Sequence, residues 1–145
     1  DLAPLACLFF KNISFDFSIK DKDIVSLIRS TREGIGFDSF LSIAKNSSIN
    51  MQEWSAILHF SERSMLRYKK EGKTFDPLQS EKIIQVALIL QKGQEVFGDT
   101  AKFNNWLDTD NTALGKTKPK DLLDNSFGIQ LIENELTKIE HGILS

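Results

Sequence analysis

The sequence has few of the residues that build most enzyme active sites and metal centres. Among its 145 residues there is one cysteine, Cys7, and there are two histidines, His59 and His141, far apart along the chain. A single cysteine excludes an intrachain disulfide and a cluster of thiolate metal ligands. The sequence also has no Gly-rich phosphate loop, no HExxH motif and no nucleophile elbow. We therefore expect a protein that is not an enzyme and that holds no metal ion and no cofactor.

Long hydrophobic runs are also missing from the sequence. The apolar stretch Leu2–Phe10 is too short to span a bilayer, and it has no basic flank of the kind found in secretion signals. Hydrophobic residues make up 41% of the chain and charged residues 26%, which is the balance of a globular domain with a real core. These features favour a cytoplasmic protein with no membrane attachment, and the single cysteine fits a reducing compartment.

The first 20 residues have a pattern of their own. Phe15, Phe17 and Ile19 alternate with polar residues, which is the period of a half-buried strand. Leu5–Phe10 is the candidate for a second strand, and together the two would form a short β-hairpin. Because a lone hairpin is only marginally stable, we expect it to pack on helices or to pair with a second chain.

From residue 21 onward the sequence predicts a mainly α-helical protein. The expected helices begin near Asp23, Phe37, Asn50, Ser61 and Asp76, and later ones cover Thr100–Leu107, Pro119–Asp124 and a last stripe from Ile129 to Ile139. Gly93 is expected to weaken the long helix that follows Asp76. A shift towards acidic residues after Phe97 marks the best candidate boundary. We therefore expect an N-terminal segment (1–20), a first helical domain (21–97) and a second one (98–145).

Two short helices, 51–58 and 61–70, flank a tight turn with the spacing of a helix-turn-helix. Residues 62–73 carry five basic and two acidic side chains. If Met65 and Leu66 face the core, the polar and basic residues lie on the other side of the second helix. The predicted DNA-binding residues are Ser61, Arg63, Ser64, Arg67, Lys69 and Lys70. Arginine suits guanine edges and lysine suits phosphates, although charge alone is equally typical of a solvated helix face.

The stretch 104–128 is rich in turn-forming residues. Trp106 closes a helix, Gly115 permits a positive φ angle, and Pro119 is suited to the first turn of the next helix. Gly128 lets the last helix approach its neighbour closely. These features predict a compact corner between helices, and by themselves they identify no chemistry.

The order of residues in this corner resembles the toxin-binding domain of Xre/MbcA/ParS-type antitoxins, the partners of RES-domain toxins. The matching positions are Phe97-Gly98-Asp99, Ala101, Trp106-Leu107, Asn111, Ala113-Leu114-Gly115, Pro119, Asp121-Leu122-Leu123, Gly128 and Ile139-Glu140-His141-Gly142. Upstream, the helix over 61–70 and the following PLQSEKI resemble the Xre-like helix-turn-helix of the same family. Lys116 and Asn125 depart from the pattern where glycine and threonine are common, which puts only the shape of the loop in question.

The resemblance implies an antitoxin with two activities. Its C-terminal domain would bind a cognate RES-type toxin that consumes NAD⁺ and would cover the toxin's active site. Its helix-turn-helix would bind operator DNA of its own operon as a homodimer. The residues expected to bind the toxin are Trp106, Leu114, Gly115, Pro119, Gly128, Glu140, His141 and Ser145. His141 has an alternative role that involves no toxin. When protonated, it interacts favourably with the dipole at the C-terminus of a helix.

Two other functions stay open at this point. The first is a stand-alone helix-turn-helix transcription regulator whose C-terminal domain senses a small ligand. The second is an oligomeric scaffold that does not bind DNA.

Overall fold

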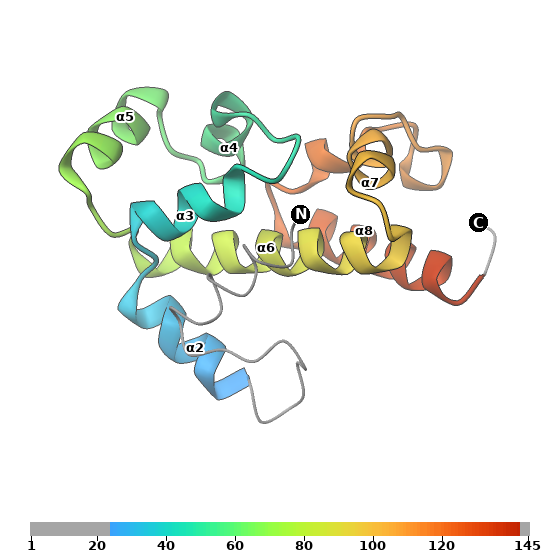
Figure 1. Ribbon diagram of the computed structural model, residues 1–145, viewed down its shortest axis with the longest axis horizontal. Helices are drawn as coiled ribbons and strands as arrows, with labels where there is room; N and C mark the ends of the chain where they lie inside the picture. The colour runs from blue at the N-terminus through green and yellow to red at the C-terminus, as the bar shows by residue number, and fades with distance from the viewer. Residues whose placement is uncertain (1–23, 143–145) are drawn as a thin grey trace.

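The computed structural model describes residues 24–142, which are built of helices and connecting turns (Figure 1). The elements are α2 (Ile24–Glu33), α3 (Phe37–Ala44), α4 (Met51–Ile57), α5 (Glu62–Glu71), α6 (Pro77–Phe97), α7 (Thr100–Leu107), the 3₁₀ helices η2 (Thr112–Leu114) and η3 (Pro119–Leu122), and α8 (Ser126–Glu140). The prediction of a mainly α-helical protein with a helix-turn-helix is confirmed. The predicted N-terminal hairpin lies outside the described residues.

The long helix α6 is the backbone of the structure. It extends along the length of the molecule, with α3, α4 and α5 above one half of it and α7 and α8 at the other (Figure 1). It packs against α2, α7 and α8. Its buried residues are Ser80, Ile83, Ile84, Val86, Ala87, Ile89, Leu90 and Gly93. The predicted boundary after Phe97 falls at the end of this helix, so α6 belongs to the first predicted domain and also supports the second.

Several helices begin where side chains cap them, as the sequence predicts. The Asn50 side chain accepts a hydrogen bond from Glu53 N (2.8 Å), and the Glu53 carboxylate accepts one from Asn50 N (2.9 Å). This reciprocal pair is a capping box at the start of α4, where the sequence predicts that a helix begins. At the start of α6, the Asp76 carboxylate accepts from Gln79 N (2.9 Å). Each such cap contributes about 1 kcal/mol to helix stability.

An aromatic cluster fills the core beneath α3, α4 and α5. The ring of Phe40 lies edge-on to Trp54 (5.0 Å between centroids) and to Phe75 (5.3 Å), and all three side chains are fully buried. Tyr68 packs against Phe75 from α5 and is only partly buried. Trp54 is therefore a core residue, and Tyr68 lies at the edge of the core.

Gly93 has a packing role that the sequence analysis did not predict. The helix α6 runs through this position without a break, and Gly93 is buried. A Cβ atom placed on Gly93 would lie 2.0 Å from the ring of Phe103 in α7. The absence of a side chain at this position lets an aromatic ring of α7 pack directly on the helix backbone.

Candidate functional site

The turn between α4 and α5 has the form of a helix-turn-helix. His59 occupies the left-handed region (φ 52°), which turns the chain sharply after α4. Ser61 then caps α5, because its hydroxyl accepts a hydrogen bond from Ser64 N (3.0 Å). At the other end, Gly72 closes α5 in the left-handed conformation (φ 61°). The two helices therefore have the short, fixed connection that the sequence spacing predicts.

The prediction that both Met65 and Leu66 of α5 face the core is wrong for Leu66. Met65 is buried, with 2% of its surface exposed, but the adjacent Leu66 is 68% exposed. Successive residues of a helix point about 100° apart, so two neighbours cannot both occupy the centre of a narrow buried face. Tyr68, three residues after Met65, takes the second inward position.

The outer face of α5 carries positive charges that have no acidic partner among the described residues. The exposed basic residues are Arg63, Arg67, Lys69 and Lys70, and no described carboxylate lies within 4.0 Å of any of them. By contrast, Lys73 just beyond the helix pairs with Glu71 (3.6 Å). The predicted residues Ser61 and Ser64 lie in the first turn and are held by the cap. This face is therefore a basic surface available to an external polyanion.

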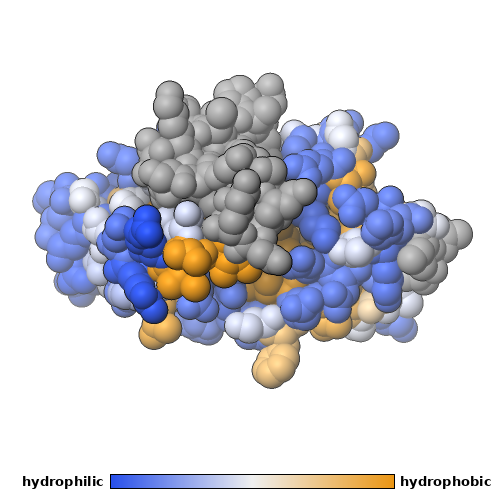
Figure 2. Space-filling view, turned by 90° about the horizontal axis from the view of Figure 1, so that it is seen from below, coloured by the Kyte–Doolittle hydropathy of each residue, from blue (hydrophilic) through white to orange (hydrophobic). Residues whose placement is uncertain are grey.

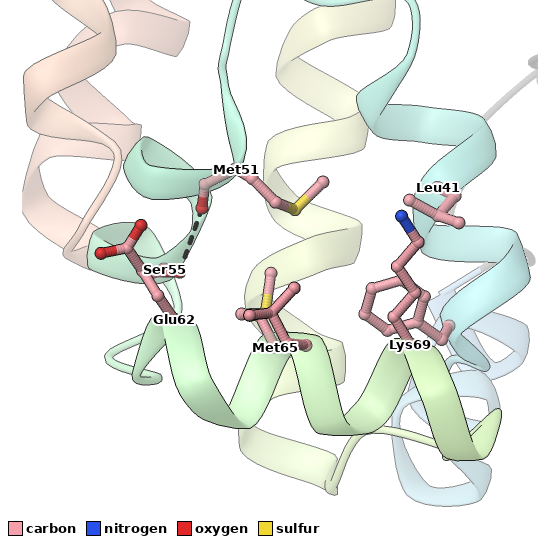
Figure 3. A pocket seen from close by; sticks show the side chains of 8 residues that line it. Leu41, Met51, Ser55, Glu62, Met65 and Lys69 are labelled. Atoms are coloured by element: carbon pink, nitrogen blue, oxygen red, sulfur yellow. Dashed lines mark hydrogen bonds between the residues drawn. The ribbon is translucent and has the colours of Figure 1, made fainter.

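A small apolar pocket of about 160 Å³ borders α5 on the side of α3 and α4 (Figure 3). Figure 3 shows Leu41, Met51 and Met65 around it, with Lys69 and Glu62 at its edges. Its complete lining is Phe37, Leu41, Met51, Ser55, Glu62, Met65, Leu66 and Lys69. The pocket is too small for most cofactors, which occupy about 300–1,000 Å³.

The predicted corner after α6 is present and is held by aromatic stacking. Trp106 stacks on Phe103 (6.1 Å, 20° between planes) and lies 5.8 Å from Phe97 at the end of α6. Gly115 has the expected positive φ angle (76°), and Pro119 opens η3. The sequence missed η2, which forms because the Asn111 side chain accepts a hydrogen bond from Ala113 N (2.9 Å).

Gly128 acts as the sequence predicts. A Cβ atom on this residue would lie 1.8 Å from the carbonyl oxygen of Leu122, so only glycine allows α8 to pack this closely on η3.

The residues predicted to bind a toxin fall into three groups. Leu114, Pro119 and Gly128 are buried, and any contribution they make to binding acts through the shape of the surface. Trp106 is partly buried, whereas Gly115, Glu140 and His141 are exposed. Ser145 lies outside the described residues. The exposed members of this set therefore lie in two places, next to η2 and at the end of α8. The buried members support these two surfaces from below.

The toxin-binding residues predicted from the sequence do not include an exposed apolar pair on α8. Phe127 is 85% exposed, and Leu131, one helical turn later, is also exposed. The sequence does contain a signal for them, because both residues lie outside the buried stripe of Ile129, Ile132 and Leu136. Large exposed apolar residues of this kind are typical of interaction surfaces.

A lysine ties the corner to the start of α4. Lys120 of η3 forms ion pairs with Asp108 after α7 and with Glu53 of α4, the latter at 2.6 Å. Only 12% of the Lys120 side chain is exposed. Burial alone would lower the pKa of Lys120, but the bonds to Asp108 and Glu53 outweigh it and raise the pKa above its usual value of 10.5. The lysine therefore stays charged and links the two halves of the molecule at neutral pH.

The described residues show no candidate metal centre. Within residues 24–142, no group of three His, Cys, Asp or Glu side chains is placed to hold a metal ion. His59 is engaged with the backbone of Asp124, and His141 lies exposed beside Glu140 (4.0 Å). None of the helices described here combines the length and the apolar character needed to cross a membrane.

On the side of α2, the surface carries an apolar patch among hydrophilic residues (Figure 2). The exposed large apolar residues of α2 are Ile24, Val25 and Ile28. Exposed apolar groups on one helix face are candidates for contact with another chain.

Two family models match the chain, and similar proteins include a curated antitoxin and a solved structure. Residues 26–88 match the antitoxin Xre-like helix-turn-helix domain, and residues 92–142 match the antitoxin Xre/MbcA/ParS C-terminal toxin-binding domain. The chain is 28% identical over 120 residues to the antitoxin Xre of Yersinia enterocolitica, covering 82% of this chain and 81% of that protein. A chain from the crystal structure of the M. tuberculosis MbcT–MbcA toxin–antitoxin complex shares the fold, with a TM-score of 0.60 and 19% identity. That match covers 75% of this chain and 96% of the other.

Proposed function

The chain belongs to the Xre/MbcA/ParS family of antitoxins, and from this premise we propose what its two halves do. The C-terminal half, residues 98–145, binds and neutralises a RES-type toxin that consumes NAD⁺. The helix-turn-helix in residues 21–97 binds operator DNA and represses the operon that encodes the pair. An antitoxin of this kind acts by binding and performs no catalysis of its own.

The observation that best supports toxin binding is the match of residues 92–142 to a toxin-binding domain. The surface of this half has features suited to a protein partner. Phe127 and Leu131 offer an exposed apolar anchor, and Glu140 and His141 stand exposed at the end of α8. Residues 99–145 carry eight acidic and five basic side chains. A pocket that accepts the pyrophosphate of NAD⁺ is expected to be basic, so an acidic intruder suits it.

The outer face of α5 supports the proposal of DNA binding. Arg63 and Arg67 lie on the exposed side of the second helix of a helix-turn-helix, the side that enters the major groove in this motif. Because no described carboxylate pairs with them, both side chains are available to phosphates and bases.

We expect the chain to bind DNA as a homodimer, because the basic surface of one copy is small. One short helix with few charges binds DNA weakly, whereas two copies can occupy half-sites about 34 Å apart. The exposed apolar residues Ile24, Val25 and Ile28 of α2 offer a surface for a second copy. Sedimentation of a chain that lacks residues 1–20 tests the other candidate dimer element. If that chain stays fully dimeric, the N-terminal segment is not the interface.

The central experiment co-expresses the chain with the product of the adjacent reading frame and measures complex formation and NAD⁺ consumption. We expect the intact chain to form a complex and to suppress NAD⁺ consumption. A chain lacking residues 140–145 should lose inhibition and keep its affinity for upstream DNA. Full inhibition by the shortened chain would show that the body of the domain, and not its end, blocks the toxin. A neighbouring product that neither binds nor consumes NAD⁺ would overturn the proposal.

A further inference from the structure

The outward stripe of α5 contains one apolar residue among its positive charges. Residues 63, 66, 67 and 70 follow the i, i+3, i+4, i+7 spacing, so they share one face of the helix. Three of them are basic, Arg63, Arg67 and Lys70, and the fourth is Leu66. Leu66 is 68% exposed although it lies beside the buried Met65. The stripe therefore presents a hydrocarbon side chain to the outside at the edge of a cationic surface, where it borders the pocket that Glu62 and Lys69 also line.

The surrounding charges limit what can cover Leu66. An apolar protein surface docked here would have to desolvate two arginines and a lysine that have no described acidic partner, at a high free-energy cost. A polyanion does not face this cost, because its phosphates pair with the same three cations. Duplex DNA also offers an apolar group at the right depth, since the 5-methyl of thymine projects into the major groove.

We propose that Leu66 selects thymine in the operator by packing against its 5-methyl group. This inference rests on the proposed DNA binding and adds a base preference to it. Side chains three and four positions apart on a helix lie about 5–6 Å from each other at Cβ. The thymine covered by Leu66 should therefore lie within one or two base pairs of the positions that Arg63 and Arg67 contact.

The position of Leu66 suits this role in a second way. It also lines the pocket between α3, α4 and α5 with Met51 and Met65, so one side of Leu66 faces other side chains of the protein. A side chain supported in this manner loses less freedom on binding than one that projects freely into solvent. Truncating Leu66 leaves the core cluster intact, because Leu66 is not among its members.

The test uses the duplex immediately upstream of the coding sequence, prepared once with thymidine and once with deoxyuridine throughout. The two duplexes have the same phosphates and the same hydrogen-bonding groups and differ only in the thymine methyl. We expect deoxyuridine to weaken binding of the wild-type chain by about fourfold for each methyl covered. Leu66→Ala should bind the thymidine duplex with a similar loss and should not distinguish the two duplexes. Leu66→Met should retain the preference.

Leu131→Ala is the matched control, because Leu131 is an exposed leucine on α8, outside the helix-turn-helix. This variant should discriminate between the two duplexes as the wild type does. Equal affinity of the wild type for both duplexes, or an undiminished preference in Leu66→Ala, would overturn the role of Leu66 while leaving DNA binding in place. Absence of wild-type binding to either duplex would overturn the proposed DNA binding, and this inference with it.

Discussion

His59, in the turn before α5, donates a hydrogen bond from Nε2 to the backbone carbonyl oxygen of Asp124 (3.0 Å), 65 residues further along the chain. Asp124 lies just before α8, so the turn of the helix-turn-helix is fastened to the start of the last helix. Together with the ion pair between Lys120 and Glu53, this bond holds both ends of α4. The orientation of the helix-turn-helix therefore depends on the half that matches a toxin-binding domain.

Replacing His59 separates the effect of this bond from that of the backbone. His59→Ala removes the bond and keeps a side chain at a positive φ angle, whereas His59→Gly removes the bond and relaxes the backbone. We expect Ala to destabilise the chain by about 1 kcal/mol more than Gly, measured by urea denaturation. Lys116→Gly is the control, because Lys116 has a similar φ angle (61°) on the exposed loop. This variant should be slightly more stable than the wild type. Equal stability of the two His59 variants would mean that the left-handed turn carries no strain.

The ion pairs of Lys120 should make stability depend on alkaline pH. The folded-state pKa of Lys120 is raised, so its charge stabilises the fold fully below the unfolded-state value of 10.5 and stops doing so as pH rises through the higher folded value. We expect Lys120→Met to lose about 2 kcal/mol at pH 7, between the values for exposed and buried pairs. The difference from wild type should shrink above about pH 10.5.

Lys118→Met serves as the control for Lys120, because Lys118 is exposed and has no described acidic partner within 4.0 Å. Its effect on stability should be small at every pH. A loss that is the same for Lys120→Met at neutral and alkaline pH would assign the effect to packing and not to charge.

Gly93→Ala should disrupt the contact between α6 and α7. The added methyl would overlap the ring of Phe103, and the cost should be about 3 kcal/mol in the free energy of unfolding. Phe103→Leu in the same chain should recover part of it by giving space. Gly36→Ala is the control, since Gly36 has a negative φ angle (−71°) and no atom within 4 Å of an added Cβ. A neutral Gly93→Ala variant would contradict the close packing.

The basic face of α5 predicts selective loss of DNA binding. Arg67→Ala should weaken binding to the upstream duplex by about 1–3 kcal/mol if the side chain reads a base, and it should leave toxin neutralisation intact. Arg32→Ala, an exposed arginine of α2, is the control and should bind nearly as the wild type does. Unchanged affinity in the double Arg63→Ala, Arg67→Ala variant, measured by fluorescence anisotropy, would remove α5 as the recognition helix.

Replacing the exposed phenylalanine of α8 should affect toxin binding and not DNA binding. Phe127→Ser should weaken the complex with the toxin by about 2 kcal/mol or more, because exposed aromatic anchors dominate many interfaces. Stability should change little, since 85% of the side chain is in solvent. Leu78→Ser, an equally exposed position at the start of α6, is the control. Unaltered toxin affinity in Phe127→Ser, measured by calorimetry, would place the interface elsewhere on the domain.

Local features of this fold were predictable from the sequence, and long-range contacts were not. The capping box of Asn50 and Glu53 and the close approach at Gly128 follow from residue types at fixed spacings, and both are confirmed. Leu66 was misplaced because the buried stripe of a ten-residue helix has room for Met65 and Tyr68 and for no third large side chain. The bond from His59 to Asp124 has no sequence signature, since any residue offers a backbone carbonyl.

In the candidate site, too, some features were predictable from the sequence and others were not. Charge and helix spacing indicated the basic face of α5, because both are properties of adjacent residues. The exposure of Phe127 was missed because its residue type alone does not indicate exposure. The signal lies in its angular position relative to Ile129 and Ile132 on α8, which places it outside the buried stripe.

The shared helix α6 has a consequence for how the chain unfolds. Because α6 packs against α2 at one end and against α7 and α8 at the other, neither half can open fully without exposing apolar surface that the other half needs. We expect one cooperative melting transition and nearly uniform protection of the α6 amides against hydrogen exchange. A protease that acts on transiently opened chains would then remove DNA binding and toxin binding at the same rate. The relief of repression and the release of the toxin would be a single event in time.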